Sequence, residues 1–387
     1  MLAQGVKIHF AHRTFSWANE ARGKAAVHCV IIGFGMQDVA DKTIYEYADI
    51  KGEPHAVKAY NINPYLADAP SLVMMPRTNP VCRVSPMVNG NKPTDGGNLI
   101  LSEQEKSELI AKEPQAEQWI KQFAMGDEFI NGVARYCLWL VDCPPQKLRT
   151  MPEVLKRVEA VKIMRLNSID ATTRQDASTP TLFQKIRQPK ENYLAIPRVS
   201  SKRRTFIPIA YASKNLIAGD KLQTIPNATL QEFGVITSTM HMAWMRTTAG
   251  RLKSDFQYSA KITYNNFPWP TLPVRGELVE PQQAVNASTG SARAVKNIEA
   301  AAQAVLDARA VHTNASLADL YDPLTMPANL LKAHQVLDKA VDAAYGYKGA
   351  ATDAARVAFL FERYQQITSL LPALVTKTKK VTKKPSN

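Results

Sequence analysis

The sequence predicts an α+β protein: a mixed domain of short strands, followed by a small helical bundle and preceded by the last strands of a doubly wound domain. Three observations predict this fold. Short apolar runs separated by Pro, Gly and Asn recur up to Pro270, as in short strands joined by turns. Apolar residues at helical spacing follow from Ile298 onwards. Two strand patterns stand at the start, and two strands alone cannot bury their faces.

The amino-acid composition and net charge favour a protein that binds polyanions. The 387 residues include 48 Lys and Arg against 34 Asp and Glu, which gives a net charge of +14. A surplus of this size attracts nucleic acid, and a basic surface without such a role is the alternative. The longest apolar run, residues 25–34, is too short to span a membrane, and no signal peptide is visible. The four cysteines make no Cys-x-x-Cys pair and no metal-ligand spacing, so we expect reduced thiols, no metal, no membrane and a cytoplasmic location.

Residues 1–42 are expected to be the end of a doubly wound domain. Val6, Ile8 and Phe10 alternate with polar residues, as in a strand. Residues 25–32 form an apolar run typical of a strand that is buried on both faces in the middle of a sheet. Because the chain begins just before the first of these strands, we expect the earlier part of this domain to be missing from it.

Residues 43–272 are expected to form the mixed domain. Turns and short strands fill residues 61–101, and a capping box of Ser102 and Glu105 begins a helix that runs to Lys121. A second helix, rich in cations, is predicted over residues 152–174. Further short strands are predicted over residues 138–141, 193–196, 206–210, 234–237 and 258–264.

The rest of the chain is expected to be helical. Residues 273–294 are rich in Ser, Thr, Gly, Ala and Glu and are expected to be a linker or insertion. Three helical patterns follow and predict a small bundle over residues 295–371. Residues 372–387 form a basic, lysine-rich tail.

Two basic clusters are candidates for contact with DNA. The first is Ser200-Ser201-Lys202-Arg203-Arg204, which lies between short strands. Cations beside small hydroxyl groups suit the binding of phosphate, and a solvated loop is the alternative.

The second cluster holds Arg251, Lys253, Ser254 and Asp255. On an extended strand Lys253 and Asp255 would point the same way. Lys donates to guanine O6 and N7, and Asp accepts from cytosine N4, so this pair is a candidate reader of one G·C pair. The alternative is a surface ion pair worth at most about 1 kcal/mol.

Two aromatic residues, Phe15 and Trp17, lie at the end of the first predicted strand. Aromatic side chains beside a catalytic cleft can stack on a base that has been flipped out of a duplex. The alternative is that both belong to a hydrophobic core. We found no arrangement typical of a serine hydrolase or a metal site, and His241 between two methionines is expected to be a core histidine.

A series of longer motifs, taken in order, resembles one family. They are Phe10-Ala11-His12-Arg13-Thr14-Phe15, Ile62-Asn63-Pro64-Tyr65-Leu66, Asp95-Gly96-Gly97-Asn98-Leu99-Ile100, Arg135-Tyr136-Cys137-Leu138-Trp139-Leu140, Pro197-Arg198-Val199-Ser200-Ser201, Tyr264-Asn265-Asn266-Phe267-Pro268-Trp269-Pro270 and Leu317-Ala318-Asp319-Leu320-Tyr321-Asp322-Pro323. The chain resembles the C-terminal part of MmeI-type (type IIL) restriction–modification proteins and their methyltransferase relatives, over nearly its whole length.

The resemblance implies an order of parts. A methyltransferase domain that uses S-adenosylmethionine precedes a target-recognition domain, and a helical domain follows. It implies that residues 1–42 are the end of the methyltransferase domain and residues 43–272 the recognition domain. It also implies that Lys253 and Asp255 belong to the base-reading surface. The expected partners are double-stranded DNA and an upstream methyltransferase half, supplied in cis or in trans.

Two motifs that an adenine-N6 methyltransferase needs are absent from the sequence. Gly33-Phe34-Gly35 follows a strand but lacks the third Gly of a donor-binding turn. Asn63-Pro64-Tyr65 lacks the second Pro of Asn-Pro-Pro-aromatic, and Asp142-Cys143-Pro144-Pro145 has the wrong spacing. We therefore expect no catalytic residue and no bound cofactor in this chain, which would be inactive alone.

The chain also departs from the family at two places. Lys202 stands where the family usually has Glu, and residues 274–293 look inserted. A sequence-specific recognition part of a methyltransferase is the leading hypothesis. A stand-alone DNA-binding module and an inert, truncated remnant are the alternatives.

Overall fold

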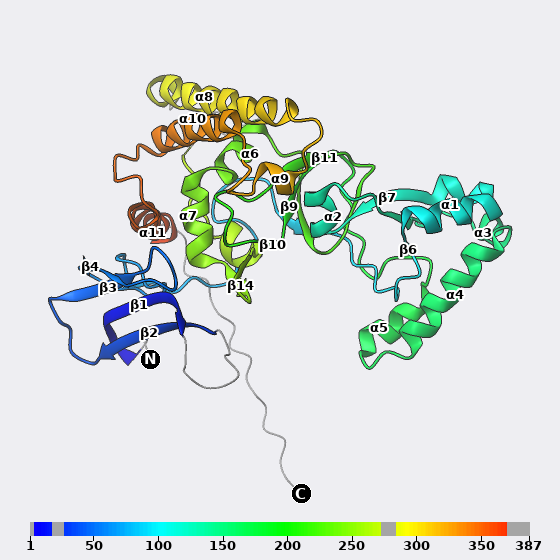
Figure 1. The fold of residues 1–387 in the computed structure, drawn as a ribbon, viewed down its shortest axis with the longest axis horizontal. Helices are drawn as coiled ribbons and strands as arrows, with labels where there is room; N and C mark the ends of the chain where they lie inside the picture. The colour runs from blue at the N-terminus through cyan, green and yellow to red at the C-terminus, as the bar shows by residue number, and fades with distance from the viewer. Residues whose placement is uncertain (1–3, 18–26, 272–283, 370–387) are drawn as a thin grey trace, which may run out of the picture.

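The computed structural model describes residues 4–17, 27–271 and 284–369. Figure 1 shows a four-stranded N-terminal sheet at one end, an arm that contains α1, α3, α4 and α5 at the other, and helices α8 and α10 along one side of the body between them. The N-terminal sheet and the arm both project to the side opposite α8 and α10 (Figure 1).

The N-terminal sheet has the strand order β2-β1-β3-β4. Its strands are β1 (Lys7–Trp17), β2 (Val27–Gly35), β3 (Lys42–Glu46) and β4 (His55–Ala59). Strand β1 is antiparallel to β2 and parallel to β3. Both predicted N-terminal strands are therefore confirmed.

The burial predicted for the second of these strands is wrong for this chain. Strand β2 lies at the edge of its sheet and pairs only with β1. Its side chains Val30, Ile31 and Ile32 are 48%, 40% and 39% exposed. Neighbouring residues of a strand point to opposite faces, so β2 is uncovered on both faces as well as along one edge.

The arm has a small hydrophobic core of its own, built on Leu99, Leu138, Val154 and Val158. Its sheet has the order β12-β7-β8-β6. Those strands are β6 (Ile100–Leu101), β7 (Ile120–Ala124), β8 (Tyr136–Leu138) and β12 (Ile217–Ala218). The helical segments of the arm are α1 (Glu103–Lys112), η2 (Pro114–Trp119), α3 (Pro145–Arg149), α4 (Pro152–Leu166), α5 (Ala171–Gln175) and η3 (Asp176–Ser178). Helix α2 (Gly126–Asn131) follows β7 and packs on the central part of the molecule.

Both helices predicted in the arm are shorter than expected. The capping box of Ser102 and Glu105 is present and begins α1. The helix ends at Lys112 because Pro114 cannot continue its hydrogen bonding, and residues 120–124 form a strand. The predicted helix 152–174 is interrupted after Leu166, and a second helix begins at Ala171, where the Asp170 side chain caps the Thr173 N–H.

The central part holds two further sheets. One has the order β11-β9-β13-β5 and the other β10-β15-β14. The strands are β5 (Val88–Asn89), β9 (Tyr193–Pro197), β10 (Val199–Ser200), β11 (Ala210–Ala212), β13 (Leu222–Pro226), β14 (Gly250–Leu252) and β15 (Asp255–Gln257). The predicted strand 193–196 is confirmed in β9.

Three other predicted strands of the central part are wrong or displaced. Residues 234–237 lie at the end of helix α6 (Leu230–Ile236), which a capping box of Thr229 and Glu232 begins. Residues 260–264 form one turn of π-helix, η4 (Ala260–Tyr264). The segment 206–209 is buried without strand pairing, and the strand begins only at Ala210. Short apolar runs fit a buried helix as well as a strand, because burial on all sides removes the periodicity.

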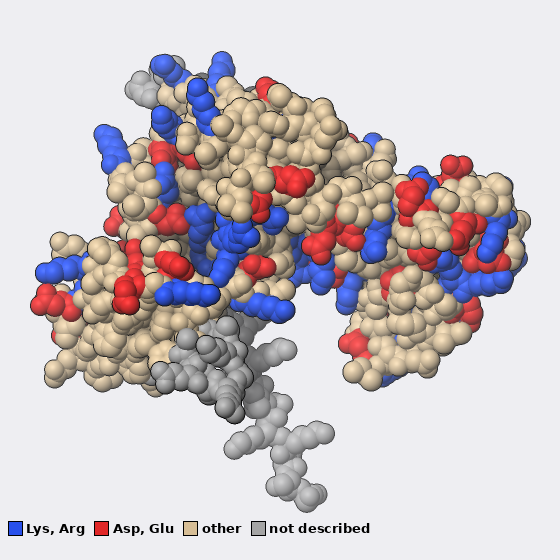
Figure 2. Space-filling view, in the orientation of Figure 1, with Lys and Arg blue, Asp and Glu red and all other residues tan. Residues whose placement is uncertain are grey.

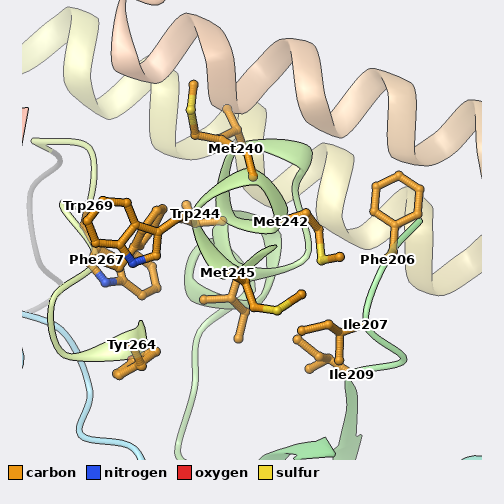
Figure 3. Close-up of a cluster of buried hydrophobic side chains, with 14 of the residues drawn as sticks. Phe206, Ile207, Ile209, Met240, Met242, Trp244, Met245, Tyr264, Phe267 and Trp269 are labelled. Carbon is orange, nitrogen blue, oxygen red and sulfur yellow. The ribbon is translucent and has the colours of Figure 1, made fainter. Parts of the chain in front are cut away.

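One hydrophobic core joins the central part to the C-terminal helices. It is centred on helix α7 (Thr239–Thr248), whose Trp244 is fully buried. Figure 3 shows the α7 methionines between Phe267 and Trp269 on one side and Phe206 and Ile209 on the other. His241 is completely buried and shares a 2.7 Å hydrogen bond with the Tyr258 hydroxyl, so the core assignment of this histidine is confirmed.

The helices that cover this core are α8 (Ala284–Ala310), α9 (Leu317–Leu320), α10 (Ala328–Tyr345) and α11 (Asp353–Ser369). Helix α8 packs on α6, and α11 packs on α7. Helix α8 begins at Ala284, so the second half of the predicted linker 273–294 is helical. Residues 272–283 and the predicted tail lie outside the described residues. None of the helices described is long and apolar enough to cross a membrane.

Candidate nucleic-acid interface

Positive charge is concentrated in the central part of the chain. Residues 192–271 contain ten Lys and Arg and three Asp and Glu, so this segment alone contributes +7 of the net +14. Figure 2 shows Lys and Arg gathered over β10 and β14, on the side from which the N-terminal sheet and the arm project. The molecule therefore has a basic surface between two projecting parts, and both predicted basic clusters lie on it.

The second basic cluster lies on a β-hairpin. Strands β14 and β15 pair from Gly250 with Gln257 to Leu252 with Asp255, so Lys253 and Ser254 form the two-residue turn. The backbone of Lys253 has φ +55°, in the left-handed region. The premise that Lys253 and Asp255 share one face of an extended strand is therefore wrong. The two residues form no ion pair, and the Lys253 side chain is exposed at the hairpin tip.

A hydrogen bond joins the two predicted clusters. The Asp255 carboxylate accepts through Oδ1 from the backbone N–H of Lys202 at 3.2 Å. Strand β10, which leads into the first cluster, also pairs with β15. Segments some fifty residues apart in the sequence thus form one surface, and the second carboxylate oxygen of Asp255 has no hydrogen bond within the described chain.

The first cluster is a compact loop, residues 201–205. The Ser201 hydroxyl accepts from the Arg203 N–H at 3.3 Å, and the Ser201 carbonyl accepts from the Arg204 N–H at 3.2 Å. Lys202 and Arg203 are exposed. Ser200 is 4% exposed, so its hydroxyl is not accessible to a phosphate in this conformation. We call this segment the basic loop.

Two arginines of the clusters, Arg204 and Arg251, are partly buried or bound within the protein. Burial lowers the pKa of Arg204, although its guanidinium remains charged. The Arg251 guanidinium lies 3.9 Å from the centre of the Phe256 ring and donates to the Ser254 carbonyl at 3.3 Å, which stiffens the hairpin. Arg203 has only a 4.0 Å contact with Asp322, and both side chains are well exposed, so Arg203 is available for other partners.

Sequence reasoning missed three residues that border the same surface: Arg198, Lys221 and Gln257. The Arg198 N–H donates to the Lys221 carbonyl at 3.0 Å, and the Arg198 carbonyl accepts from the Tyr258 N–H at 2.8 Å. A cleft of about 550 Å³ lies beside them, lined in part by Arg198, Gln223 and Gln257. Arg198 Nε and Gln223 Oε1 are buried there without a hydrogen-bond partner. Arg198 lies within the Pro197-Arg198-Val199-Ser200-Ser201 motif, but nothing local to the sequence indicates that it meets Lys221 and Gln257, because strand pairing brings them together.

The two N-terminal aromatics lie apart from this surface, on β1. Phe15 is half-buried and stacks on Tyr47, with ring centroids 5.2 Å apart and planes 17° apart. Trp17 is 49% exposed, so it is not a core residue in this chain. The core alternative is therefore wrong for Trp17, and its predicted contact with a flipped base stays a prediction.

The Gly33-Phe34-Gly35 segment does not form a donor-binding turn. Gly33 and Gly35 lie inside strand β2, not in a turn that leads to a helix. A side chain at Gly33 would collide with the ring of Phe10. Glycine at this position therefore allows close packing within the sheet, and it forms no phosphate- or nucleoside-binding loop.

Both near-matches to the catalytic motif have structural roles. Asn63 is fully buried, and its Oδ1 accepts from the backbone N–H groups of Tyr65 and Ala67, which fixes a turn. Pro144 and Pro145 begin the short helix α3. In the described residues no three metal-binding side chains come together.

Comparisons with known proteins match the whole order of these parts. Three family models match the chain: "MmeI, DNA-methyltransferase domain" over residues 1–46, "MmeI, target recognition domain" over residues 68–271 and "MmeI, C-terminal domain" over residues 290–372. The chain is 35% identical to DNA methyltransferase A of Bacillus subtilis (strain 168) over 364 residues, which is 94% of this chain and 39% of that protein.

A solved structure is also similar, that of the type IIL restriction–modification enzyme MmeI in complex with DNA. The identity is 50% and the TM-score 0.84, with 95% of this chain and 47% of that chain covered. The chain thus spans less than half the length of both relatives.

Proposed function

Because the chain belongs to the MmeI family of restriction–modification methyltransferases, we propose that it recognises a specific sequence in double-stranded DNA as part of an adenine-N6 methyltransferase. The observation that carries this proposal is the hydrogen bond between Asp255 and Lys202, which holds the basic loop beside the hairpin on the basic surface seen in Figure 2. That arrangement provides cations for phosphates next to side chains of a size that reaches base edges.

The two clusters take different roles in this proposal. Lys202 and Arg203 are exposed and would neutralise phosphates, which fixes the position of the duplex without selecting a sequence. Lys253 projects from the hairpin tip and would donate to guanine. Asp255 would use its second carboxylate oxygen to accept from the paired cytosine. The pair can still act on one G·C pair although it does not lie on an extended strand, because a hairpin tip fits the major groove.

The N-terminal sheet supports an upstream methyltransferase half as the partner. Strand β2 is uncovered on both faces and along its free edge, and residues 1–46 match the methyltransferase model. We infer that the preceding part of that domain, in cis or in trans, pairs with β2 and covers Val30, Ile32 and Phe34. S-adenosylmethionine would be bound by that half, and Phe15 or Trp17 would border the pocket for the flipped adenine.

A stand-alone DNA-binding module is the second candidate. The core around α7 includes buried residues from Ala67 to Tyr364 but none of strands β1–β4, so the basic surface does not depend on the N-terminal sheet for its packing. If the chain binds a defined sequence by itself, this function exists without methyl transfer. An inert remnant would bind no duplex with sequence preference.

The binding experiment selects duplexes from a random pool with the purified chain and compares three variants. Lys253→Ala should lose preference at one base pair, by about 1–3 kcal/mol, with nonspecific affinity little changed. Arg203→Ala should weaken all duplexes alike and lower the slope of log Kobs against log salt by about 0.9. Lys339→Ala removes an exposed cation on α10 and serves as the control. An unchanged base preference in Lys253→Ala would show that this residue does not read a base.

Methyl transfer is tested separately with tritiated S-adenosylmethionine. We expect no transfer to DNA by this chain alone, and transfer after an upstream half is added. Transfer by the chain alone that is lost in Phe15→Ala/Trp17→Ala would place the donor site within this chain and overturn the division proposed here.

A further inference from the structure

The segment that follows the basic loop is anchored in the C-terminal helices. Phe206, Ile207 and Ile209 are at most 2% exposed. The Phe206 ring stacks on the ring of His334 in α10, with centroids 4.0 Å apart and planes 20° apart. The Ile209 carbonyl accepts from Arg309 Nη1 of α8 at 2.7 Å. The four-residue segment that follows the basic loop is therefore attached at its first residue to α10 and at its last residue to α8.

A buried polar network connects these two anchors. Arg309 Nε donates to the Tyr321 hydroxyl at 2.7 Å, and the same hydroxyl lies 2.8 Å from His334 Nε2. Arg309 donates to this hydroxyl through both Nε and Nη2, which uses both lone pairs of the Tyr321 oxygen, so the Tyr321 proton is directed to His334 Nε2. Contacts therefore form a closed ring through Ile209, Arg309, Tyr321, His334 and Phe206.

The charge of this network is fixed. Burial, and to a lesser extent the nearby Arg309 cation, lower the pKa of His334 to about 3, so the imidazole is neutral near pH 7. Neutral His334 accepts through Nε2 and carries its proton on Nδ1, an atom that is buried without a partner.

The buried polar groups of this network stabilise the fold less than apolar side chains of similar size would. Arg309 is 8% exposed, and no carboxylate among the described residues forms an ion pair with it. A buried cation without a counterion and a buried unpartnered N–H both cost stability, which apolar side chains of similar size would avoid. Fully buried polar groups do, however, enforce one geometry, because any other arrangement leaves more of them unsatisfied.

A further contact holds the same, C-terminal end of the basic loop. Arg246, at the end of α7, donates through Nη2 to the Thr205 carbonyl at 2.8 Å and through Nη1 to Asp353 of α11 at 2.8 Å. The basic loop is thus connected to α8, α10 and α11. Among the described residues, its only hydrogen bond to the hairpin is the one that the Lys202 N–H donates to Asp255.

We propose that the C-terminal helical domain sets the position of the basic loop for DNA contact, with Arg309, Tyr321 and His334 as positioning residues. The proposal rests on the proposed function, because the loop must contact DNA for its position to matter. In this arrangement the helices touch no DNA through these residues. The contacts of the C-terminal helices fix where Lys202 and Arg203 lie relative to the hairpin.

The test compares Tyr321→Phe with Tyr345→Phe in the full chain. Both changes remove one buried hydroxyl from the same helical domain, but the Tyr345 hydroxyl donates to the Pro268 carbonyl and has no link to the loop. Amide hydrogen exchange at residues 203–209 should accelerate about tenfold in Tyr321→Phe, as expected for the loss of one hydrogen bond to a charged group, and should not change in Tyr345→Phe.

DNA binding provides the second measurement. In Tyr321→Phe the slope of log Kobs against log salt should fall by about 0.9 for each phosphate contact that is lost, with Tyr345→Phe unchanged. Phe206→Leu, which removes the stacking on His334 but keeps an apolar side chain, should give the same two changes if Tyr321→Phe does not fold.

The two measurements separate the possible failures. Equal exchange in Tyr321→Phe and Tyr345→Phe would overturn the positioning role whether or not DNA binds. Faster exchange in Tyr321→Phe with an unchanged salt slope would also overturn it, because loop position would then not affect DNA contact. If wild-type protein binds no duplex, the proposed function fails, and with it the purpose of the network.

Discussion

At the scale of single residues, Asp338 links the stability of the helical layer to pH. Its carboxylate accepts from the Thr239 N–H at 2.7 Å, at the start of α7. Burial raises the pKa of Asp338 from 3.8 to about 6, against smaller opposing effects of Thr239 and Arg356. A raised pKa in the folded state means that this residue contributes most stability below pH 4 and loses that contribution as pH rises through 6.

We expect Asp338→Asn to remove this dependence. The variant keeps an acceptor for the Thr239 N–H but has no charge to bury. Relative to wild type it should gain stability as pH rises from 4 to 7, by at most about 3 kcal/mol, which is the free energy that corresponds to the change in pKa. Denaturant unfolding of both proteins at pH 4, 5, 6 and 7 measures the difference. A constant difference across this range would contradict the raised pKa.

Arg165 is a cation that the sequence places on a helix surface but that the fold buries. It belongs to the cation-rich helix predicted over residues 152–174, yet it is fully buried. Its guanidinium donates to the carbonyls of five residues: Pro93, Thr94, Asp176, Thr179 and Leu182. The charge holds separate segments of the arm together and has no access to DNA.

At the scale of elements, the arm is therefore expected to depend on Arg165. Arg165→Met keeps a similar length of apolar side chain but leaves five carbonyls without their donor. The arm should lose about 3–5 kcal/mol of stability, as for the removal of a buried charged partner. Trypsin cleavage within residues 92–190 should accelerate, while Arg174→Met, a change at a more exposed arginine of the arm, should have little effect. Equal cleavage of both variants would contradict this role.

At the scale of the whole molecule, the uncovered strand β2 is expected to cause self-association. It combines a free hydrogen-bonding edge with exposed apolar side chains on both faces. Val30→Thr/Ile32→Thr should lower the fraction of oligomer measured by sedimentation velocity, because β-branched Thr keeps the strand but is polar. The control is Val57→Thr on β4, the opposite edge strand, where Val57 is 37% exposed.

The same variant connects this prediction to the proposed partner. If an upstream methyltransferase half covers β2, Val30→Thr/Ile32→Thr should also weaken its association with this chain, and Val57→Thr should not. Unchanged association in both variants would show that the partner does not bind at β2.

The class of the protein, the order of its parts and both basic clusters could be predicted from the sequence. These features depend on composition and on long, continuous motifs, which folding does not alter. The capping box at Ser102, strand β9 and the core histidine were also predictable, because hydrogen bonding within a few residues or an apolar neighbourhood specifies them. Helix ends and short buried segments such as residues 234–237 were not, since burial on all sides removes the alternation that separates helix from strand.

Which distant residues contact one another could be learned only from the folded structure. It placed Lys253 in a turn rather than on a strand, joined Asp255 to Lys202, and brought Arg198 and Gln257 to the same surface. It also merged the recognition part and the helical domain into one core and connected the basic loop to Arg309 and His334. Contacts between residues fifty to more than a hundred positions apart depend on strand pairing and helix packing. The spacing of residues along the sequence does not predict either of these.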